Sequence, residues 1–201
     1  MFRIDILLLS LALGLYAQNV AAQDPISPPG TVPIRTVGLC VLSDRKTPIS
    51  RTTIENLIDH LSADYTEQVG IAFKMVELHD HRFASDARDP KIQHACAAGN
   101  AILIFTNRNG VQRENGEEKE LLGMEYPGVV WIYRTARRTA RESSAFTTLE
   151  HEIAHLFGVD DDNDPQSFMN SRGRGTSWTP TIRRIIRDHS MWEWGGKDDI
   201  T

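Results

Sequence analysis

The chain is poor in cysteine, and it lacks both a continuous basic stripe and, beyond its N-terminus, any long apolar run. Its 201 residues carry a net charge of −5, and lysine and arginine are scattered except for one cluster, Arg134, Arg137, Arg138 and Arg141. Nucleic-acid binding requires a basic face, so the composition argues against a nucleic-acid partner. The arginine cluster is either a solvated surface stretch or an electropositive rim for acidic substrates.

The one long apolar run, Ile6–Leu15, follows Arg3 and precedes the small residues Ala21 and Ala22. This layout is typical of a secretory signal peptide that is cleaved before Gln23. The run is shorter than the roughly 20 residues that span a bilayer, and an uncleaved N-terminal anchor is the alternative.

We therefore predict a signal peptide at residues 1–22, a flexible leader rich in proline and glycine at 23–33, and one zinc metallopeptidase domain at 34–201, the last for reasons given below. The protein is expected to be secreted or periplasmic, with no stable membrane association after signal cleavage.

The two cysteines are Cys40 and Cys96. An even number of cysteines in an exported chain predicts one disulfide between them. Because Cys40 lies in a strand-like run and Cys96 in a helix-like one, two buried free thiols are the alternative.

Short apolar runs rich in β-branched residues predict the strands of a largely parallel sheet. They cover residues 34–42, 71–78, 101–106, 120–126 and 128–133. The run at 101–106 is the most apolar, so we expect it to be a central strand. The polar stretch 107–119 contains Asn-Gly twice and is predicted to be a turn or flexible loop.

Apolar residues at steps of three and four predict a long helix between Ser50 and Gly70. Further helices are predicted over 89–98, from Ser143 or Ser144 onward, and after Thr179-Pro180. The alternation of strands and helices indicates an α/β (α+β) domain with a mostly parallel sheet. We interpret His79 and His81, which follow a predicted strand, as exposed loop residues rather than metal ligands.

His151-Glu152-x-x-His155 is the strongest chemical signal in the sequence. Residues four apart lie on one face of a helix, so both imidazoles can bind one Zn²⁺ ion. Glu152 can face the open side of the metal and act as general base toward metal-activated water. Because so short a motif also arises by chance, the residues that follow it matter.

Gly158 lies where it can end the helix and permit a left-handed turn, after which the chain presents Asp161 as a third zinc ligand. Met169 follows eight residues later. Asp160 by a register shift, or Glu193 from a later helix, are alternative third ligands. The acidic residues near Asp161 are interpreted as a loop whose aspartates bond the backbone, and Ca²⁺ binding is the alternative without further support.

Residues 151–169 resemble the signature of the metzincin zinc metalloproteases, H-E-x-x-H-x-x-G-x-x-H followed by a Met-turn. The spacing to the methionine, with the intervening Asp164-Pro165, is similar to that of the matrixins, and aspartate as third ligand is similar to the snapalysins. The resemblance implies that Met169 forms a hydrophobic floor beneath the zinc. It also implies a mostly parallel, twisted sheet with an antiparallel edge strand. Substrate would lie extended along that strand, for which 120–126 is our candidate.

The expected function is that of a secreted zinc-dependent endopeptidase, a monomer that acts on protein or peptide substrates. One alternative is a catalytically silent secreted binding protein of the same fold, against which the retained Glu152 argues. The other is an archaemetzincin-like aminopeptidase. It would need an acidic group to hold the substrate amine, and Glu125 and Glu142 are candidates that the sequence does not distinguish.

Overall fold

The computed structural model describes residues 35–189 except 47, 84–91, 93, 98–99, 107, 115, 127, 134–141 and 171–174. The predicted signal peptide and leader, the arginine cluster and Glu193 lie outside the described residues. So does much of the predicted helix 89–98, of which Ile92 is helical whereas His94 and Ala95 lie in a turn.

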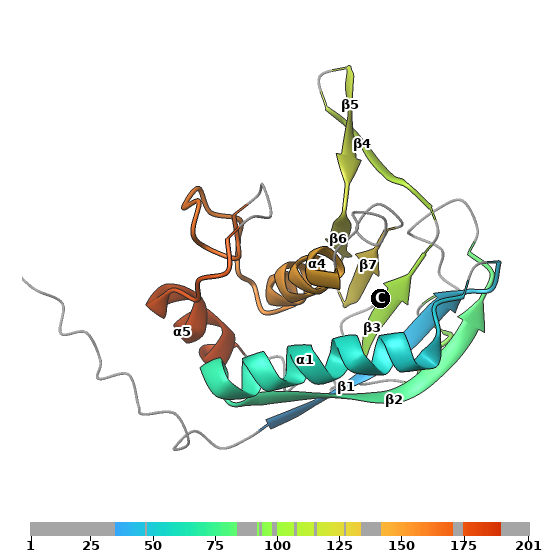
Figure 1. The fold of residues 1–201 in the computed structure, drawn as a ribbon, viewed down its shortest axis with the longest axis horizontal. Coiled ribbons are helices and arrows are strands. Elements are labelled where there is room, and N and C mark those ends of the chain that lie inside the picture. Colours follow the sequence, from blue (N-terminus) through green and yellow to red (C-terminus); the bar gives the residue numbers. More distant parts are fainter. Residues whose placement is uncertain are drawn as a thin grey trace, which may run out of the picture.

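A five-stranded sheet with the order β2-β1-β3-β7-β6 forms the centre of the molecule (Figure 1). β1 (Arg35–Asp44) pairs in parallel with β2 (Ile71–His81) and β3 (Ala101–Phe105), and β3 pairs in parallel with β7 (Val129–Ile132). β6 (Gly123–Tyr126) pairs antiparallel with β7 at the edge of the sheet. The predicted α/β class, the central position of β3 and the antiparallel edge strand are confirmed.

The stretch predicted as a flexible loop, 107–119, is instead largely a hairpin that projects from the domain (Figure 1). β4 (Gly110–Glu114) pairs antiparallel with β5 (Glu117–Leu121). Gly116 has a φ of 86°, the left-handed conformation that a tight hairpin turn of the Asn-Gly kind requires. The loop prediction was wrong because the flanking residues are polar, so the usual alternation of a hairpin is missing.

Two further strand boundaries differ from the prediction. The predicted single strand 120–126 is interrupted at Leu122, where β5 ends and β6 begins. β2 extends to His81, so His79 and His81 lie in a strand rather than in a loop.

α1 (Arg51–Val69) and α4 (Glu142–Leu156) pack against one face of the sheet, and α5 (Pro180–Asp188) lies beside the end of α1 (Figure 1). In α1, the Ser50 hydroxyl accepts the Thr53 N–H, and Gly70 ends the helix at φ 74°. α4 carries the His-Glu-x-x-His motif and α5 is capped by Thr179, as expected. α4 starts before Ser143 and Ser144, so neither of these predicted caps lies at its N-cap position. Among the described residues, no helix has the length and apolarity to cross a bilayer.

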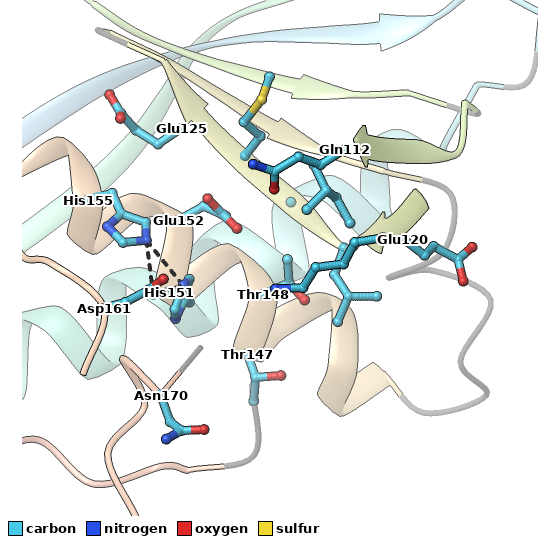
Figure 2. Close-up of a pocket in the computed structure, with 15 residues that line it drawn as sticks. Gln112, Glu120, Glu125, Thr147, Thr148, His151, Glu152, His155, Asp161 and Asn170 are labelled. Atoms are coloured by element: carbon cyan, nitrogen blue, oxygen red, sulfur yellow. Dashed lines mark hydrogen bonds and ion pairs between the residues drawn. The ribbon is translucent and has the colours of Figure 1, made fainter. Parts of the chain in front are cut away.

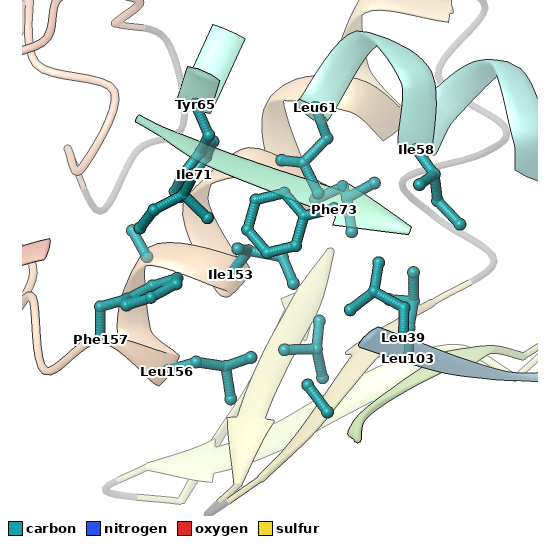
Figure 3. Close-up of a cluster of buried hydrophobic side chains, with 14 of the residues drawn as sticks. Leu39, Ile58, Leu61, Tyr65, Ile71, Phe73, Leu103, Ile153, Leu156 and Phe157 are labelled. Carbon is teal, nitrogen blue, oxygen red and sulfur yellow. The ribbon is translucent and has the colours of Figure 1, made fainter. Parts of the chain in front are cut away.

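The main core lies between the sheet and the helices (Figure 3). Tyr65 of α1 is fully buried there, together with Leu39 and Leu103 of the sheet. Phe157, the residue directly after α4, is also fully buried there. A second apolar cluster on the opposite face contains Trp131, Phe83 and Cys40. Cys40 forms a disulfide with Cys96, which confirms the predicted pair.

Candidate metal centre and cleft

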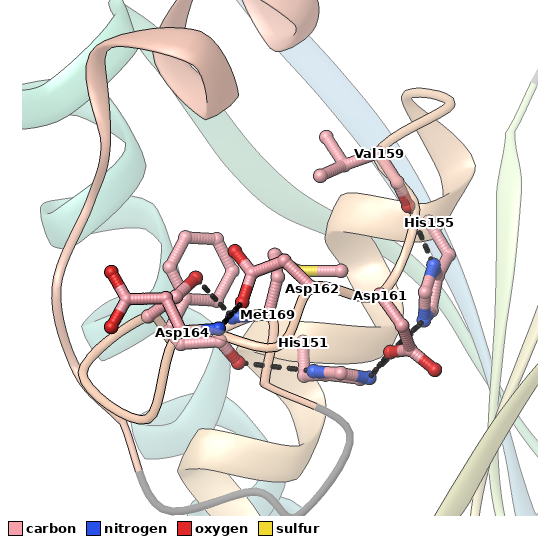
Figure 4. Close-up of polar contacts among 9 residues, drawn as sticks. His151, His155, Val159, Asp161, Asp162, Asp164 and Met169 are labelled. Atoms are coloured by element: carbon pink, nitrogen blue, oxygen red, sulfur yellow. Dashed lines mark hydrogen bonds and ion pairs between the residues drawn. The ribbon is translucent and has the colours of Figure 1, made fainter.

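The three predicted ligands come from α4 and from the chain reversal that follows it. His151 and His155 are one helical turn apart on α4, and Gly158 follows at φ 74°. This left-handed residue ends the helix and turns the chain back, so that Asp161 lies beside both histidines (Figure 4). The glycine has the predicted left-handed conformation.

The ligand atoms of these residues converge on one point. His151 Nε2 lies 3.1 Å from His155 Nε2, and Asp161 Oδ1 lies 3.1 Å and 3.6 Å from the two nitrogens, in that order. These three side chains form one of two groups among the described residues with the spacing of a metal site. Asp160 is not part of it.

Each imidazole is oriented by a main-chain carbonyl. His151 Nδ1 donates to the Phe168 carbonyl at 3.0 Å, and His155 Nδ1 donates to the Val159 carbonyl at 2.7 Å (Figure 4). In the neutral tautomer that these bonds fix, Nε2 carries a lone pair and no proton. Burial lowers the pKa of His151 and so favours this neutral form. Two nitrogen lone pairs and a carboxylate oxygen therefore face each other, as a divalent cation requires.

The loop that supplies the Phe168 carbonyl is organised by the aspartates of the acidic run. Asp162 accepts the Asp164 N–H, and Asp164 accepts the Gln166 N–H. Both side chains thus have the backbone-bonding role predicted for them, and the metal groups found among the described residues include neither. Met169 is fully buried in the main core.

Glu152 projects from α4 toward the edge strand β6 and is 8% exposed. Gly123 of β6 leaves room for it, because a Cβ atom there would lie 2.5 Å from Glu152 Cγ. The carboxyl accepts the main-chain N–H of Glu125. Burial raises the pKa of Glu152 to about 8, and the charges of Asp161 and Glu125 add to this effect.

Glu150, two residues earlier, points into the core instead. Its carboxyl accepts the indole N–H of Trp178 at 3.0 Å, and its main-chain carbonyl accepts the Tyr65 hydroxyl at 2.9 Å. Trp178 packs edge to face on Tyr65 and also against Phe168, whose carbonyl holds His151. These aromatic side chains therefore form a packed cluster beside the turn of α4 that carries the ligands.

The outer edge of β6 faces the cleft. The Tyr133 N–H donates to the Leu122 carbonyl, and Met124 pairs with Trp131 on β7. Because alternate residues of an edge strand turn their N–H and C=O groups to opposite sides, Gly123 and Glu125 present theirs to the free edge. The bond from the Glu125 N–H to Glu152 agrees with this orientation.

The cleft has a volume of about 530 Å³ and runs between α4 and the segment β5–β6 (Figure 2). Its lining includes the three ligands and Glu152, together with residues that the sequence analysis did not single out: Gln112, Lys119, Gly123, Thr147, Thr148 and Asn170. Two of these carried a signal. Thr147 lies four residues before His151 and therefore on its helical face, and Gly123 is a glycine inside a predicted strand, which often marks a close approach.

The histidines of β2 lie apart from the cleft. His79 bonds the Glu77 carboxylate on β2, and these two residues with Cys40 form the second group of metal-ligand spacing, although the Cys40 sulfur is already bonded to Cys96. Glu142 starts α4. His79 and His81 lie at the end of β2 and are not among the three residues of the proposed metal centre.

No family model matches this chain, and no curated protein matches it. Among solved structures, an archaemetzincin from Archaeoglobus fulgidus complexed with malonate has a TM-score of 0.50 at 14% identity and covers 76% of this chain and 100% of its own. An archaemetzincin from Methanopyrus kandleri has a TM-score of 0.49 at 14% identity, with 77% and 87% covered. A zinc-dependent peptidase from Methanocorpusculum labreanum has a TM-score of 0.46 at 16% identity, with 74% and 100% covered.

The chain therefore has the α/β fold of an archaemetzincin over about three quarters of its length. The structures found are similar in fold to this chain at low sequence identity. The resemblance of residues 151–169 to matrixins and snapalysins stays a prediction from sequence.

Proposed function

We propose that this protein is a zinc-dependent peptidase, in which His151, His155 and Asp161 hold the metal and Glu152 is the general base. The observation that carries the proposal is the convergence of two imidazole nitrogens and one carboxylate oxygen within 3.6 Å of one another. Both imidazoles are oriented by carbonyl groups, a support typical of metal ligands.

The donor set fits zinc. Two histidines and one carboxylate are a known ligand combination for catalytic zinc, and three protein ligands leave a fourth position open toward the cleft. A structural zinc site is usually closed by four protein ligands. When bound, zinc would polarise the scissile carbonyl and lower the pKa of a water molecule beside it. The fully buried Met169 would lie beneath the ion as an apolar floor.

Glu152 is placed to move the proton that hydrolysis requires. Its buried carboxyl lies between the ligand-bearing face of α4 and the free edge of β6, where a peptide would lie. From this position the carboxyl can take a proton from the attacking water. It can then donate that proton to the leaving amine.

The substrate is proposed to be a protein or peptide in extended form, which pairs with the free N–H and C=O groups of Gly123 and Glu125. Binding along an edge strand suits cleavage within a chain, so we propose an endopeptidase. The alternative of an aminopeptidase receives support from the archaemetzincin-like fold and from the acidic side chain of Glu125 in the cleft. A catalytically silent binding protein has no use for a buried glutamate beside a metal centre.

We further propose that the protein is exported and acts outside the cytoplasm as a monomer. The disulfide between Cys40 and Cys96 supports export, since such bonds persist in oxidising compartments.

The proposed activity is tested with purified protein, a library of internally quenched peptides and a zinc chelator. We expect one equivalent of zinc, cleavage that the chelator abolishes, and restoration by added zinc. Glu152→Gln should keep the metal and lose about 10²-fold or more of kcat/KM. Glu117→Gln, the same chemical change on the exposed face of β5, is the matched control. Undiminished cleavage by Glu152→Gln would rule out the mechanism.

A further inference from the structure

Glu125 lines the cleft close to the proposed reaction centre. Residues two apart in a strand share a face, so Glu125 projects toward α4 as Gly123 does. It lines the cleft and lies at the His155 end, whereas Glu120 lies at the opposite end (Figure 2). The side chain is partly buried, and within the described residues no lysine or arginine pairs with it.

The direction of β6 decides which part of a substrate would meet Glu125. Antiparallel pairing is the more stable arrangement, and β6 already pairs in this way with β7. A peptide on the free edge would then run from Glu125 toward Gly123. Its N-terminal part lies beside Glu125, and its C-terminal part continues toward β5, where Lys119 lines the cleft. Glu125 thus marks one end of the cleft, whereas the other end carries both Lys119 and Glu120.

We propose that Glu125 is a specificity-determining residue that selects a substrate cation on the N-terminal side of the scissile bond. The inference rests on the proposed peptidase function. The cation is an ammonium or guanidinium group, which would donate charge-assisted hydrogen bonds to a partly desolvated carboxylate. It comes either from the free N-terminal amine of a short acyl-side fragment or from a lysine or arginine side chain. The first source would make the enzyme an aminopeptidase, and the second an endopeptidase.

The burial of Glu125 agrees with this role. Burial raises the pKa of its carboxyl. An approaching cation would replace part of the solvation that the carboxylate has lost, which a neutral substrate cannot do.

The test uses one quenched peptide in four forms. Its N-terminus is free or acetylated, and the residues before the cleaved bond carry lysine or the isosteric norleucine. Zinc-loaded wild-type protein should cleave at least one cationic form with about 10- to 100-fold higher kcat/KM than the acetylated norleucine form. Glu125→Gln should lose that preference by about tenfold or more, whereas Glu117→Gln should retain it.

The source of the cation follows from which change removes the preference: acetylation identifies the terminal amine, and norleucine identifies the side chain. Either result supports the proposal. It is overturned if the wild-type protein cleaves all four peptides alike, if Glu125→Gln slows all four alike, or if the preferred cation lies after the cleaved bond. The wild-type comparison needs no variant, so it remains decisive even if Glu125→Gln folds poorly.

A binding measurement separates this inference from the peptidase function. Calorimetry with the zinc-loaded Glu152→Gln variant should show tighter binding of the cationic peptide than of the acetylated norleucine peptide. In the double variant that also carries Glu125→Gln, this difference in affinity should disappear. If the wild-type protein cleaves no peptide, the proposed function fails. If cleavage depends on Glu152 but not on charge, only the role of Glu125 fails.

Discussion

The two walls of the cleft are built in different ways. The lower wall, made of α4 and residues 157–170, holds its functional side chains by bonds to buried main chain: the Phe168 and Val159 carbonyls fix the two histidines. The upper wall, made of β4 to β6, is a projecting hairpin followed by a four-residue edge strand, and four of the five residues of β5 are exposed.

The lower wall therefore carries the groups for the reaction, and the upper wall carries groups that can recognise the substrate. Metal ligands and a general base must be held within a fraction of an ångström, which packed and hydrogen-bonded elements achieve. An edge strand and a hairpin offer main-chain groups and exposed side chains that different peptides can use. Substitutions in the lower wall should therefore change metal binding, stability or the proton transfer by Glu152, whereas those in the upper wall should alter turnover and affinity for substrate.

The largest effect is expected for Asp161→Ala, which removes one of three proposed ligands. Zinc affinity, measured by competition with a chromophoric chelator, should fall by well over 100-fold, since loss of an outer-shell partner alone costs about 10- to 100-fold. Asp161→His should keep zinc and part of the activity, because imidazole is also a zinc ligand. If Asp161→Ala binds zinc normally while Asp160→Ala does not, the neighbouring aspartate is the ligand.

Substitution of Glu150 tests how its buried contacts support the lower wall of the cleft. Burial and then the charge of Asp64 raise its pKa from 4.5 to about 7. Between these pH values the unfolded chain ionises while the folded protein keeps its proton, so the free energy of unfolding falls as pH rises. The loss is about 1.4 kcal/mol per pH unit and about 3 kcal/mol in total.

The measurement is urea denaturation of metal-free protein between pH 4.5 and 8. Glu150→Gln keeps an oxygen for the Trp178 N–H and should show a flatter dependence on pH than the wild-type protein. Equal slopes for both proteins would mean that Glu150 is already ionised in the folded state.

Gly123→Ala should affect the general base without affecting the metal. The added Cβ would lie 2.5 Å from Glu152 Cγ and 2.6 Å from Oε1, so the carboxyl must move. A displacement of about 1 Å can cost roughly 100-fold in rate, and we expect turnover to slow by about 10- to 100-fold. Zinc affinity should stay at the wild-type value. A parallel loss of zinc would show that the two walls are not independent.

The smallest effects are expected on the hairpin. Gln112→Ala and Lys119→Ala remove side chains that line the cleft from exposed strands, and each should raise KM about two- to fivefold, with a smaller change in kcat. Glu117→Gln again serves as control. If turnover instead slowed by about 100-fold or more, the hairpin would take part in the reaction itself.

The sequence predicted the lower wall far better than the upper one. Capping residues and periodicity are local signals, so α1 with Ser50 and Gly70, and the turn at Gly158, could be located directly. The same holds for the predicted ligands, because a helix fixes the spacing of His151 and His155 and one left-handed residue determines where the chain returns.

The upper wall depends on pairings between strands that local patterns do not determine. The hairpin β4–β5 has polar residues on both faces, and only the neighbouring Gly123 marks the interruption at Leu122. Whether Glu125 faces the cleft or the opposite side depends on the register of β6 against β7, since a shift by one residue reverses every side chain. The sequence therefore offered Glu125 and Glu142 as equal candidates.

The bond between Cys40 and Cys96 closes a covalent ring that contains all of α1 and β2. A single cut of the main chain at any point inside the ring leaves both fragments joined. A peptidase is always exposed to digestion by its own copies, and such a nick would release no piece of this molecule. Nicked protein should run as one band on a non-reducing gel and as two after reduction.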